Sequence, residues 1–142
     1  MQDGPYDPVW SSLETHEQIP DWFVDAKFGV YFHWGPYSVP AYGSEWYSRN
    51  MYEPDHHIYD HHSERYGDPA EFGYKDLIPQ FSAEQFDADE WAQHCADAGA
   101  EFVGLTVEHH DGFAMWDSEL TPWNAADMGP QRDVVGELAD AV

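Results

Sequence analysis

Residues 101–113 read EFVGLTVEHHDGF, and residues 27–35 read KFGVYFHWG. Each stretch opens with aromatic or β-branched residues and closes on a turn signal, which is the pattern of a buried strand. The later run is apolar along most of its length, as expected for a parallel strand covered on both faces. The sequence therefore predicts strands at 27–33 and 101–107.

A helix is predicted between the two strands. Asp87 can cap its start, with Glu90 three residues on, and Gly99 supplies the stop. A second helix is predicted to begin after Asp133, in VVGELADAV. The resulting βαβα order is typical of an α/β domain with a parallel sheet.

The chain divides into a polar N-terminal arm, 1–21, and the βαβα unit, 22–142. Within the unit, residues 34–80 are rich in Tyr, His, Pro and Gly and show no sustained period. This long loop exceeds an ordinary connection, so we expect it to be either functional or locally helical.

The charge of the chain is strongly negative. Its 142 residues include 28 Asp plus Glu against 5 Lys plus Arg, a formal net charge of −23. Such a surface repels phosphate backbones and anionic lipid headgroups, which argues against nucleic-acid and membrane partners. Molar salt would screen the self-repulsion. We therefore interpret the acidic composition as halophilic adaptation, with an acidic mesophilic protein as the alternative.

Cysteine content and the N-terminus bear on the compartment. Cys95 is the single cysteine, which excludes an intramolecular disulfide and a multi-cysteine zinc site. The opening MQDGPYDPVW lacks a basic segment followed by an apolar one, and no window approaches the ~20 apolar residues of a membrane span. We expect a cytoplasmic protein.

Histidines stand at the ends of both predicted strands: His33 in FHWG, and His109 and His110 in EHHDGF. Ligands bind at strand carboxyl ends in parallel α/β folds, so His33 and one of the paired histidines are expected in one cavity. Imidazoles there can ligate a metal, move protons or bind hydroxyls. Four tryptophans lie near these histidines in the sequence: Trp34, Trp46, Trp116 and Trp123. Because aromatic rings cover the C–H face of a sugar, they make a site that binds a polyol as plausible for the histidines as a purely structural role.

A second histidine cluster, DHHIYDHH, occupies residues 55–62. His57 and His61 are four residues apart, so on a helix they would share a face and could bind a transition metal with Asp55 or Asp60. The simpler interpretation, which we adopt, is that these are surface or packing histidines of the long loop.

Two long stretches resemble the N-terminal part of the α-L-fucosidases of glycoside hydrolase family 29. They are WFVDAKFGVYFHWGPYSVPAYGSEWYSRNMY, at 22–52, and FSAEQFDADEWAQHCADAGAEFVGLTVEHHDGFAMWDSELTPWNAADMGPQRDVVGEL, at 81–138. The resemblance implies an incomplete (β/α)8, TIM-like barrel, of which this chain supplies the first two βα units only. It also implies removal of terminal α-L-fucose with retention of configuration, through a covalent glycosyl-enzyme.

The same resemblance implies a set of fucose-binding residues: His33, Glu45, Trp46, His109 and His110. It implies no cofactor and no metal, and it places the nucleophile and the acid/base beyond this chain, so that no catalytic residue is assigned within it. A retaining glycosidase needs two carboxylates about 5–5.5 Å apart, and a complete barrel needs about 250 residues. We therefore expect the chain to be inactive by itself.

Several interpretations remain open. The chain can be part of a split gene, a degenerate remnant, or a fragment that assembles with the missing C-terminal part of the barrel. Its expected partners are terminal α-L-fucosyl glycans or glycosides. The alternatives to an α-L-fucosidase-like hydrolase are a noncatalytic sugar-binding or partner-assembled fragment, and a metal-dependent hydrolase that uses His33, His109 and His110.

Overall fold

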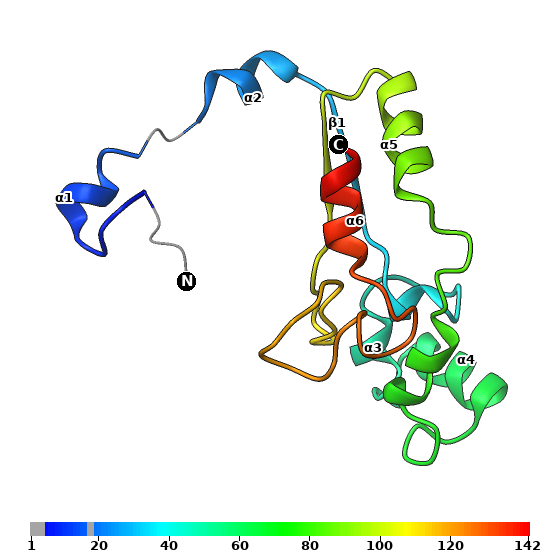
Figure 1. Ribbon diagram of the computed structural model, residues 1–142. Helices are drawn as coiled ribbons and strands as arrows, with labels where there is room; N and C mark the ends of the chain where they lie inside the picture. The colour runs from blue at the N-terminus through cyan, green and yellow to red at the C-terminus, as the bar shows by residue number, and fades with distance from the viewer. Residues whose placement is uncertain (1–4, 17–18) are drawn as a thin grey trace.

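A computed structural model describes residues 5–16 and 19–142 of the chain. Its centre is a pair of parallel strands, β1 (Gly29–Phe32) and β2 (Phe102–Leu105), which pair from Gly29 opposite Phe102 to Phe32 opposite Leu105. Helices α5 (Ala88–Asp97) and α6 (Val134–Ala141) run alongside the strands (Figure 1). The segment between β1 and α5 packs at the carboxyl ends of the strands (Figure 1). The residues that follow β1 and those that follow β2 therefore lie in the same region.

Both predicted helix starts are confirmed. Asp87 accepts a hydrogen bond from the backbone N–H of Glu90 at 3.0 Å, and Asp133 accepts one from that of Gly136 at 2.7 Å. Each carboxylate satisfies a backbone donor that the first helical turn leaves free. Gly99, at φ +84°, follows the end of α5 in the left-handed conformation that glycine adopts without strain.

The segment 34–80 is locally helical, as one of the two sequence interpretations proposed. It contains α3 (Tyr47–Asn50), α4 (His57–Tyr66) and three 3-10 turns, at Pro36–Ser38, Tyr74–Asp76 and Ile78–Gln80. These pieces pack around a core of their own: Tyr37, Tyr47, Met51, Ile58, Tyr74 and Leu77. A second core lies between the sheet and helices α5 and α6, and includes Phe81, Phe86, Phe113, Val134 and Leu138.

The second histidine cluster falls on α4. His62 is fully buried, where Nδ1 lies 3.0 Å from the Tyr47 hydroxyl and Nε2 lies 2.8 Å from the Phe72 carbonyl oxygen. His61 stacks on Tyr42 with ring centroids 3.8 Å apart. Within residues 5–16 and 19–142, no group of three potential metal ligands draws on this helix. The packing interpretation is therefore the one that the contacts support.

The strands are shorter than the sequence predicted. Lys27 has a positive φ of 60° and ends helix α2 (Asp21–Ala26), so β1 begins two residues later, at Gly29. The second strand likewise spans Phe102–Leu105 rather than 101–107. Full coverage of both faces is also wrong for β2, because all four of its residues are only partly buried. The two-stranded sheet, which is the whole of the sheet in the described residues, leaves Tyr31 62% exposed.

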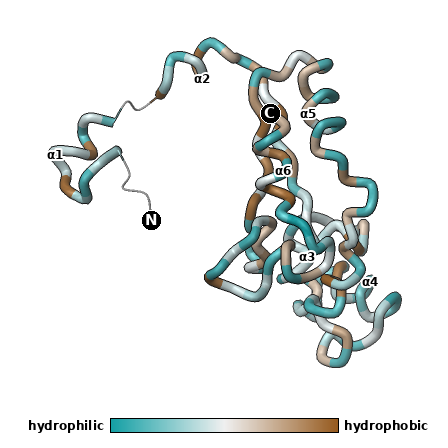
Figure 2. Tube along the Cα trace, in the orientation of Figure 1, coloured by the Kyte–Doolittle hydropathy of each residue, from teal (hydrophilic) through white to brown (hydrophobic). Residues whose placement is uncertain are grey.

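The predicted N-terminal arm, 1–21, contains the short helix α1 (Trp10–Leu13), and its last residue, Asp21, is the first residue of α2. Residues 1–4 and 17–18 of the predicted arm lie outside the described residues. Figure 2 shows hydrophobic residues along the strands. None of the described helices has the length and apolar character needed to cross a membrane.

Candidate functional site

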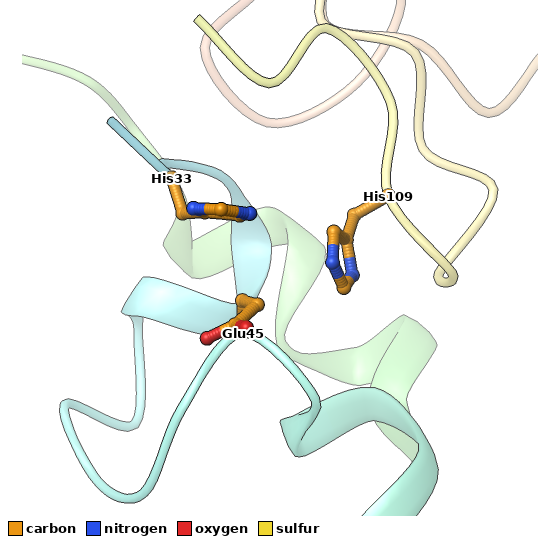
Figure 3. A group of neighbouring side chains, drawn as sticks. All are labelled: His33, Glu45 and His109. Atoms are coloured by element: carbon orange, nitrogen blue, oxygen red, sulfur yellow. The ribbon is translucent and has the colours of Figure 1, made fainter. Parts of the chain in front are cut away.

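Three side chains from separate parts of the chain meet beyond the strands: His33, Glu45 and His109. His33 follows β1 directly, His109 lies on the loop after β2, and Glu45 precedes α3. One nitrogen or carboxylate oxygen from each lies within 4.8 Å of the others. The two imidazole rings extend toward one another, with Glu45 below the gap between them (Figure 3). His33 and one of the paired histidines, His109, therefore lie side by side, with ring centroids 5.4 Å apart.

Strand register explains why these groups converge. Tyr31 lies opposite Gly104, and a side chain at Gly104 would meet the Tyr31 ring at 2.7 Å. The Tyr31 hydroxyl therefore reaches Thr106, with 2.7 Å between the oxygens. His33, two residues after Tyr31, packs edge-on to it with ring centroids 5.2 Å apart. Because alternate residues of a strand lie on the same face, His33 lies on the same face as Tyr31 and points into the cluster.

An aromatic wall stands beside the cluster. The Trp46 indole stacks on His110, with ring centroids 4.1 Å apart at 28°, and meets His109 edge-on at 5.4 Å. Trp46 remains 36% exposed, so part of its ring is free to contact a ligand. Tyr37 approaches His109 from another side, at 5.7 Å. All five residues expected from the sequence to bind a sugar therefore lie together.

His109 is electrostatically distinct. Burial lowers the pKa of its imidazole from the ordinary 6.5, and the neighbouring His110 and His33 lower it further, whereas Asp111 and Glu45 act in the opposite direction. Its Nδ1 atom is buried and has no hydrogen-bond partner among the described residues. The ring is therefore neutral at neutral pH and can both donate and accept a hydrogen bond, as recognition of a hydroxyl requires.

The loop that carries His109 and His110 is held in place by hydrogen bonds to Asp111. The buried Tyr74 donates its hydroxyl hydrogen to Asp111 Oδ2 at 2.6 Å, while Asp111 Oδ1 accepts the backbone N–H of Phe113 at 3.2 Å. Burial first, and the Asp111 charge second, raise the pKa of Tyr74, which keeps its hydroxyl protonated as a donor. Gly112, at φ +67°, completes the turn that follows Asp111.

Tyr37 and Tyr74 are site residues that the sequence reasoning missed. Both are buried, and the Tyr37 hydroxyl has no hydrogen-bond partner among the described residues. Burial is the largest cause of a raised pKa in Tyr37, followed by the charges of Asp111 and Glu45. The available signal was only the abundance of tyrosine in residues 34–80, which does not tell a packing tyrosine from one that faces the site.

Two of the tryptophans that suggested a sugar site lie elsewhere. Trp34 is partly buried and packs against the core residues Phe81 and Phe86 and against Trp91, at centroid distances of 4.9 to 5.3 Å. Trp123 borders a separate pocket, near Lys75. An open pocket of about 330 Å³ does adjoin the cluster, lined by His33, Tyr37, Ser38, Ala41, Tyr42, Gly43, Ser44 and Glu45.

Comparison with known proteins adds an independent observation. The model of the family described as alpha-L-fucosidase matches residues 1–142, the entire chain. The chain belongs to the alpha-L-fucosidase family. Tissue alpha-L-fucosidase of Mus musculus is 45% identical over 139 residues, covering 96% of this chain and 30% of that relative. The Homo sapiens tissue alpha-L-fucosidase is 45% identical over 138 residues, covering 96% of the chain and 29% of the relative.

Solved alpha-L-fucosidase structures share the backbone fold of this chain. The Thermotoga maritima alpha-fucosidase superposes with a TM-score of 0.89 at 39% identity, covering 96% of this chain and 34% of that one, and one such structure is a complex with fucose. The resemblance seen in the sequence is thereby confirmed, as is the α/β class with two parallel strands. The chain spans about 30% of the length of the curated relatives it matches.

Proposed function

We propose that this chain forms the fucose-recognition part of a retaining α-L-fucosidase. The observation that carries the proposal is the convergence of His33, Glu45 and His109 within 4.8 Å in a member of this family. The finer architecture that we propose is the first two βα units of a (β/α)8 barrel. The parallel β1–β2 pairing and the superposition on part of a fucosidase structure support that assignment.

Each side chain has a role that its chemistry suits. Glu45 offers two carboxylate oxygens to hydroxyl hydrogens of the sugar, and each charge-assisted hydrogen bond contributes about 1.5–3 kcal/mol. His109 is neutral, so it can accept from one hydroxyl while donating to another. Trp46 presents an exposed ring to the C–H face of the sugar, and its stacking holds the His110 ring in place.

The cluster holds one carboxylate, Glu45, whereas a retaining glycosidase needs two, about 5–5.5 Å apart. Asp111 is not among the described residues that converge with Glu45, and its two oxygens accept hydrogen bonds from Tyr74 and from the backbone of Phe113, which fix it in the turn of the loop. We therefore assign hydrolysis of terminal α-L-fucosides to the complete barrel, in which other segments supply the nucleophile and the acid/base. Binding without turnover is the second candidate function, and the same shortage of carboxylates favours it for this chain alone.

The exposed strand edges support assembly with the remainder of the barrel as partner. Several large apolar side chains near the sheet lie open to solvent, among them Trp22, Phe23, Phe28 and Tyr31. In the described residues the sheet stops at two strands, whereas the matched relatives are about three times longer than the chain. Further strands would cover these side chains and pair the free edges.

The test uses L-fucose binding and turnover as separate readouts. Calorimetry in molar potassium chloride measures L-fucose binding to the chain, with D-glucose as a control sugar. Hydrolysis of a chromogenic α-L-fucoside is measured for the chain and for the same chain extended by the downstream coding sequence. We expect fucose binding by both and turnover by the extended protein only. Turnover by the chain alone would overturn the assignment of hydrolysis to the complete barrel. Absence of fucose binding by both the chain and the extended protein would overturn the proposed fucose recognition.

Matched variants place the binding in the cluster. Glu45→Gln keeps the side-chain shape and removes the charge, and we expect it to weaken fucose binding by about tenfold, which corresponds to one charge-assisted hydrogen bond. Glu64→Gln makes the same change on an exposed face of α4, so it should bind fucose like the parent. Equal effects of the two substitutions would point to overall charge rather than to the site.

A further inference from the structure

The His33, Glu45 and His109 cluster has the donor set of a zinc site as well as that of a sugar site. Two imidazoles and one carboxylate form a set that Zn²⁺ accepts in proteins, with the fourth position left to water. The sequence reasoning had considered His33, His109 and His110 as a metal set. The structure replaces His110 by Glu45, because the His110 ring stacks flat on Trp46.

We infer that His33, Glu45 and His109 also bind Zn²⁺ or a similar borderline transition-metal ion, and that the ion excludes the sugar from the same atoms. The exclusion rests on the proposed function, whereas the metal binding itself does not. Because the ion uses the groups that would hold the sugar hydroxyls, such a site is inhibitory rather than catalytic.

The distances allow this coordination with small side-chain movements. In a tetrahedral zinc site with bonds of about 2.0–2.2 Å, ligand atoms lie about 3.4 Å apart, so atoms now within 4.8 Å need to close by no more than about 1.4 Å. His33 is exposed, and its ring can turn toward the others without displacing core residues. Glu45 lies in the turn that precedes α3, below the two imidazoles, with one carboxylate oxygen within 4.8 Å of a nitrogen of each (Figure 3).

Two further features favour a cation at this point. Nδ1 of His109 is buried without a hydrogen-bond partner among the described residues, and a bound ion or its water ligand would supply one. The formal net charge of −23 also raises the concentration of every divalent cation near the surface. The attraction by net charge does not distinguish Mg²⁺ from Zn²⁺. A ligand set with two imidazoles favours Zn²⁺, because Mg²⁺ prefers oxygen ligands.

The experiment measures Zn²⁺ binding by competition with a zinc-sensitive chelating dye, using the full 142-residue chain, with Mg²⁺ as the control for the general field. We expect one equivalent of Zn²⁺ to bind in the presence of excess Mg²⁺. His109→Ala and Glu45→Gln should each weaken it by about 100-fold, since loss of even an outer partner costs 10–100-fold. The double variant His57→Ala/His61→Ala removes a histidine pair on α4 and should bind as the parent does.

Co²⁺ supplies a readout independent of affinity. A tetrahedral nitrogen and oxygen set gives Co²⁺ an intense visible absorption, and this band should vanish in Glu45→Gln while circular dichroism shows an unchanged fold. Zn²⁺ that Mg²⁺ displaces, or Zn²⁺ binding that is lost in the α4 double variant and kept in His109→Ala, would overturn the inferred site.

Adding L-fucose separates this inference from the proposed function. Fucose that raises the apparent dissociation constant for Zn²⁺ supports the shared atoms. If fucose binds in calorimetry but Zn²⁺ does not bind, the metal inference alone is wrong. If Zn²⁺ binds at the cluster and fucose neither binds nor competes, the inferred exclusion is overturned together with the proposed sugar site, while the metal site stands.

Discussion

Removing the Tyr74 hydroxyl tests how the histidine loop is fixed. The perturbation is Tyr74→Phe, which deletes the 2.6 Å hydrogen bond to Asp111 Oδ2 and leaves the buried ring in place. A hydrogen bond to a charged acceptor contributes about 1.5–3 kcal/mol. Asp111 is only partly buried, so water can replace part of the lost bond. We therefore expect a loss near the lower end, about 1.5 kcal/mol, in the free energy of unfolding.

Urea unfolding followed by tryptophan fluorescence measures this loss, and a double-mutant cycle isolates it. Tyr74→Phe should cost about 1.5 kcal/mol in the parent and close to nothing in an Asp111→Ala background, where the acceptor is already gone. Tyr66→Phe is the matched control, because among the described residues the hydrogen bond of its hydroxyl is an exposed one, accepted from Arg65 Nε. An equal cost of Tyr74→Phe in both backgrounds would refute the assignment of stability to this bond.

The same variant should weaken the proposed sugar site, because Asp111 directly follows the two site histidines on the chain. A loop released from Tyr74 samples more conformations, and binding must then restore the productive one. L-fucose affinity measured by calorimetry should therefore fall in Tyr74→Phe and remain unchanged in Tyr66→Phe. Unchanged affinity in both would mean that the turn at Gly112 fixes the loop without help from the hydroxyl.

The remaining predictions concern pH, salt and the core. Burial raises the pKa of Tyr47 from 10.0 to about 12, so its contribution to stability is complete below pH 10 and is lost as the pH rises toward 12. The difference in the free energy of unfolding between the parent and Tyr47→Phe, measured by urea unfolding, should therefore shrink between pH 10 and pH 12, and a difference that does not change with pH would contradict this. Raising potassium chloride from low to molar concentration should raise the urea concentration at the unfolding midpoint, because salt screens the repulsion within a chain of formal net charge −23. A midpoint that does not change with salt would contradict the interpretation of the acidic composition as halophilic adaptation. Trp34→Ala should cost about 3 kcal/mol in the free energy of unfolding, the lower end for a buried aromatic residue, because Trp34 is only partly buried while it contacts Phe81, Phe86 and Trp91. Trp123→Ala, at a partly exposed position, is its control, and equal losses would contradict the core assignment.

Local features of the fold could be predicted from the sequence, because their causes lie within a few residues. The caps at Asp87 and Asp133 bond to backbone three residues away, and Gly99 ends α5 through its own conformation. The limits of β1 could not be predicted, since the turn at Lys27 depends on where α2 ends rather than on strand propensity. In the same way, sequence proximity to His33 suggested that Trp34 lines the site, whereas alternation along the chain turns it into the core.

The site residues were predicted from motif resemblance, but the contacts that hold them were not. Tyr74 and Asp111 are separated by 37 residues, and Tyr31 and Thr106 by 75. No local pattern encodes such pairs, because the first exists only after the segment 34–80 has folded against the loop that follows β2, and the second only after β1 has paired with β2. Its irregular series of short helices and 3-10 turns also explains why no hydrophobic period marked it as structured.

The composition of the cluster separates recognition from chemistry. One free carboxylate and two imidazoles can hold the hydroxyls of a sugar ground state, but interactions of equal strength in the ground and transition states do not accelerate a reaction. A retaining mechanism also requires a second carboxylate about 5–5.5 Å from the first. Among the described residues, Asp111 does not belong to the group that converges with Glu45, and the Tyr74→Phe substitution removes one hydrogen bond of Asp111 without bringing it there. We therefore expect the Tyr74→Phe variant to show no turnover on a chromogenic fucoside. Turnover gained in that variant would show that a carboxylate within this chain can act as nucleophile or acid/base, contrary to the division proposed between this segment and the rest of the barrel.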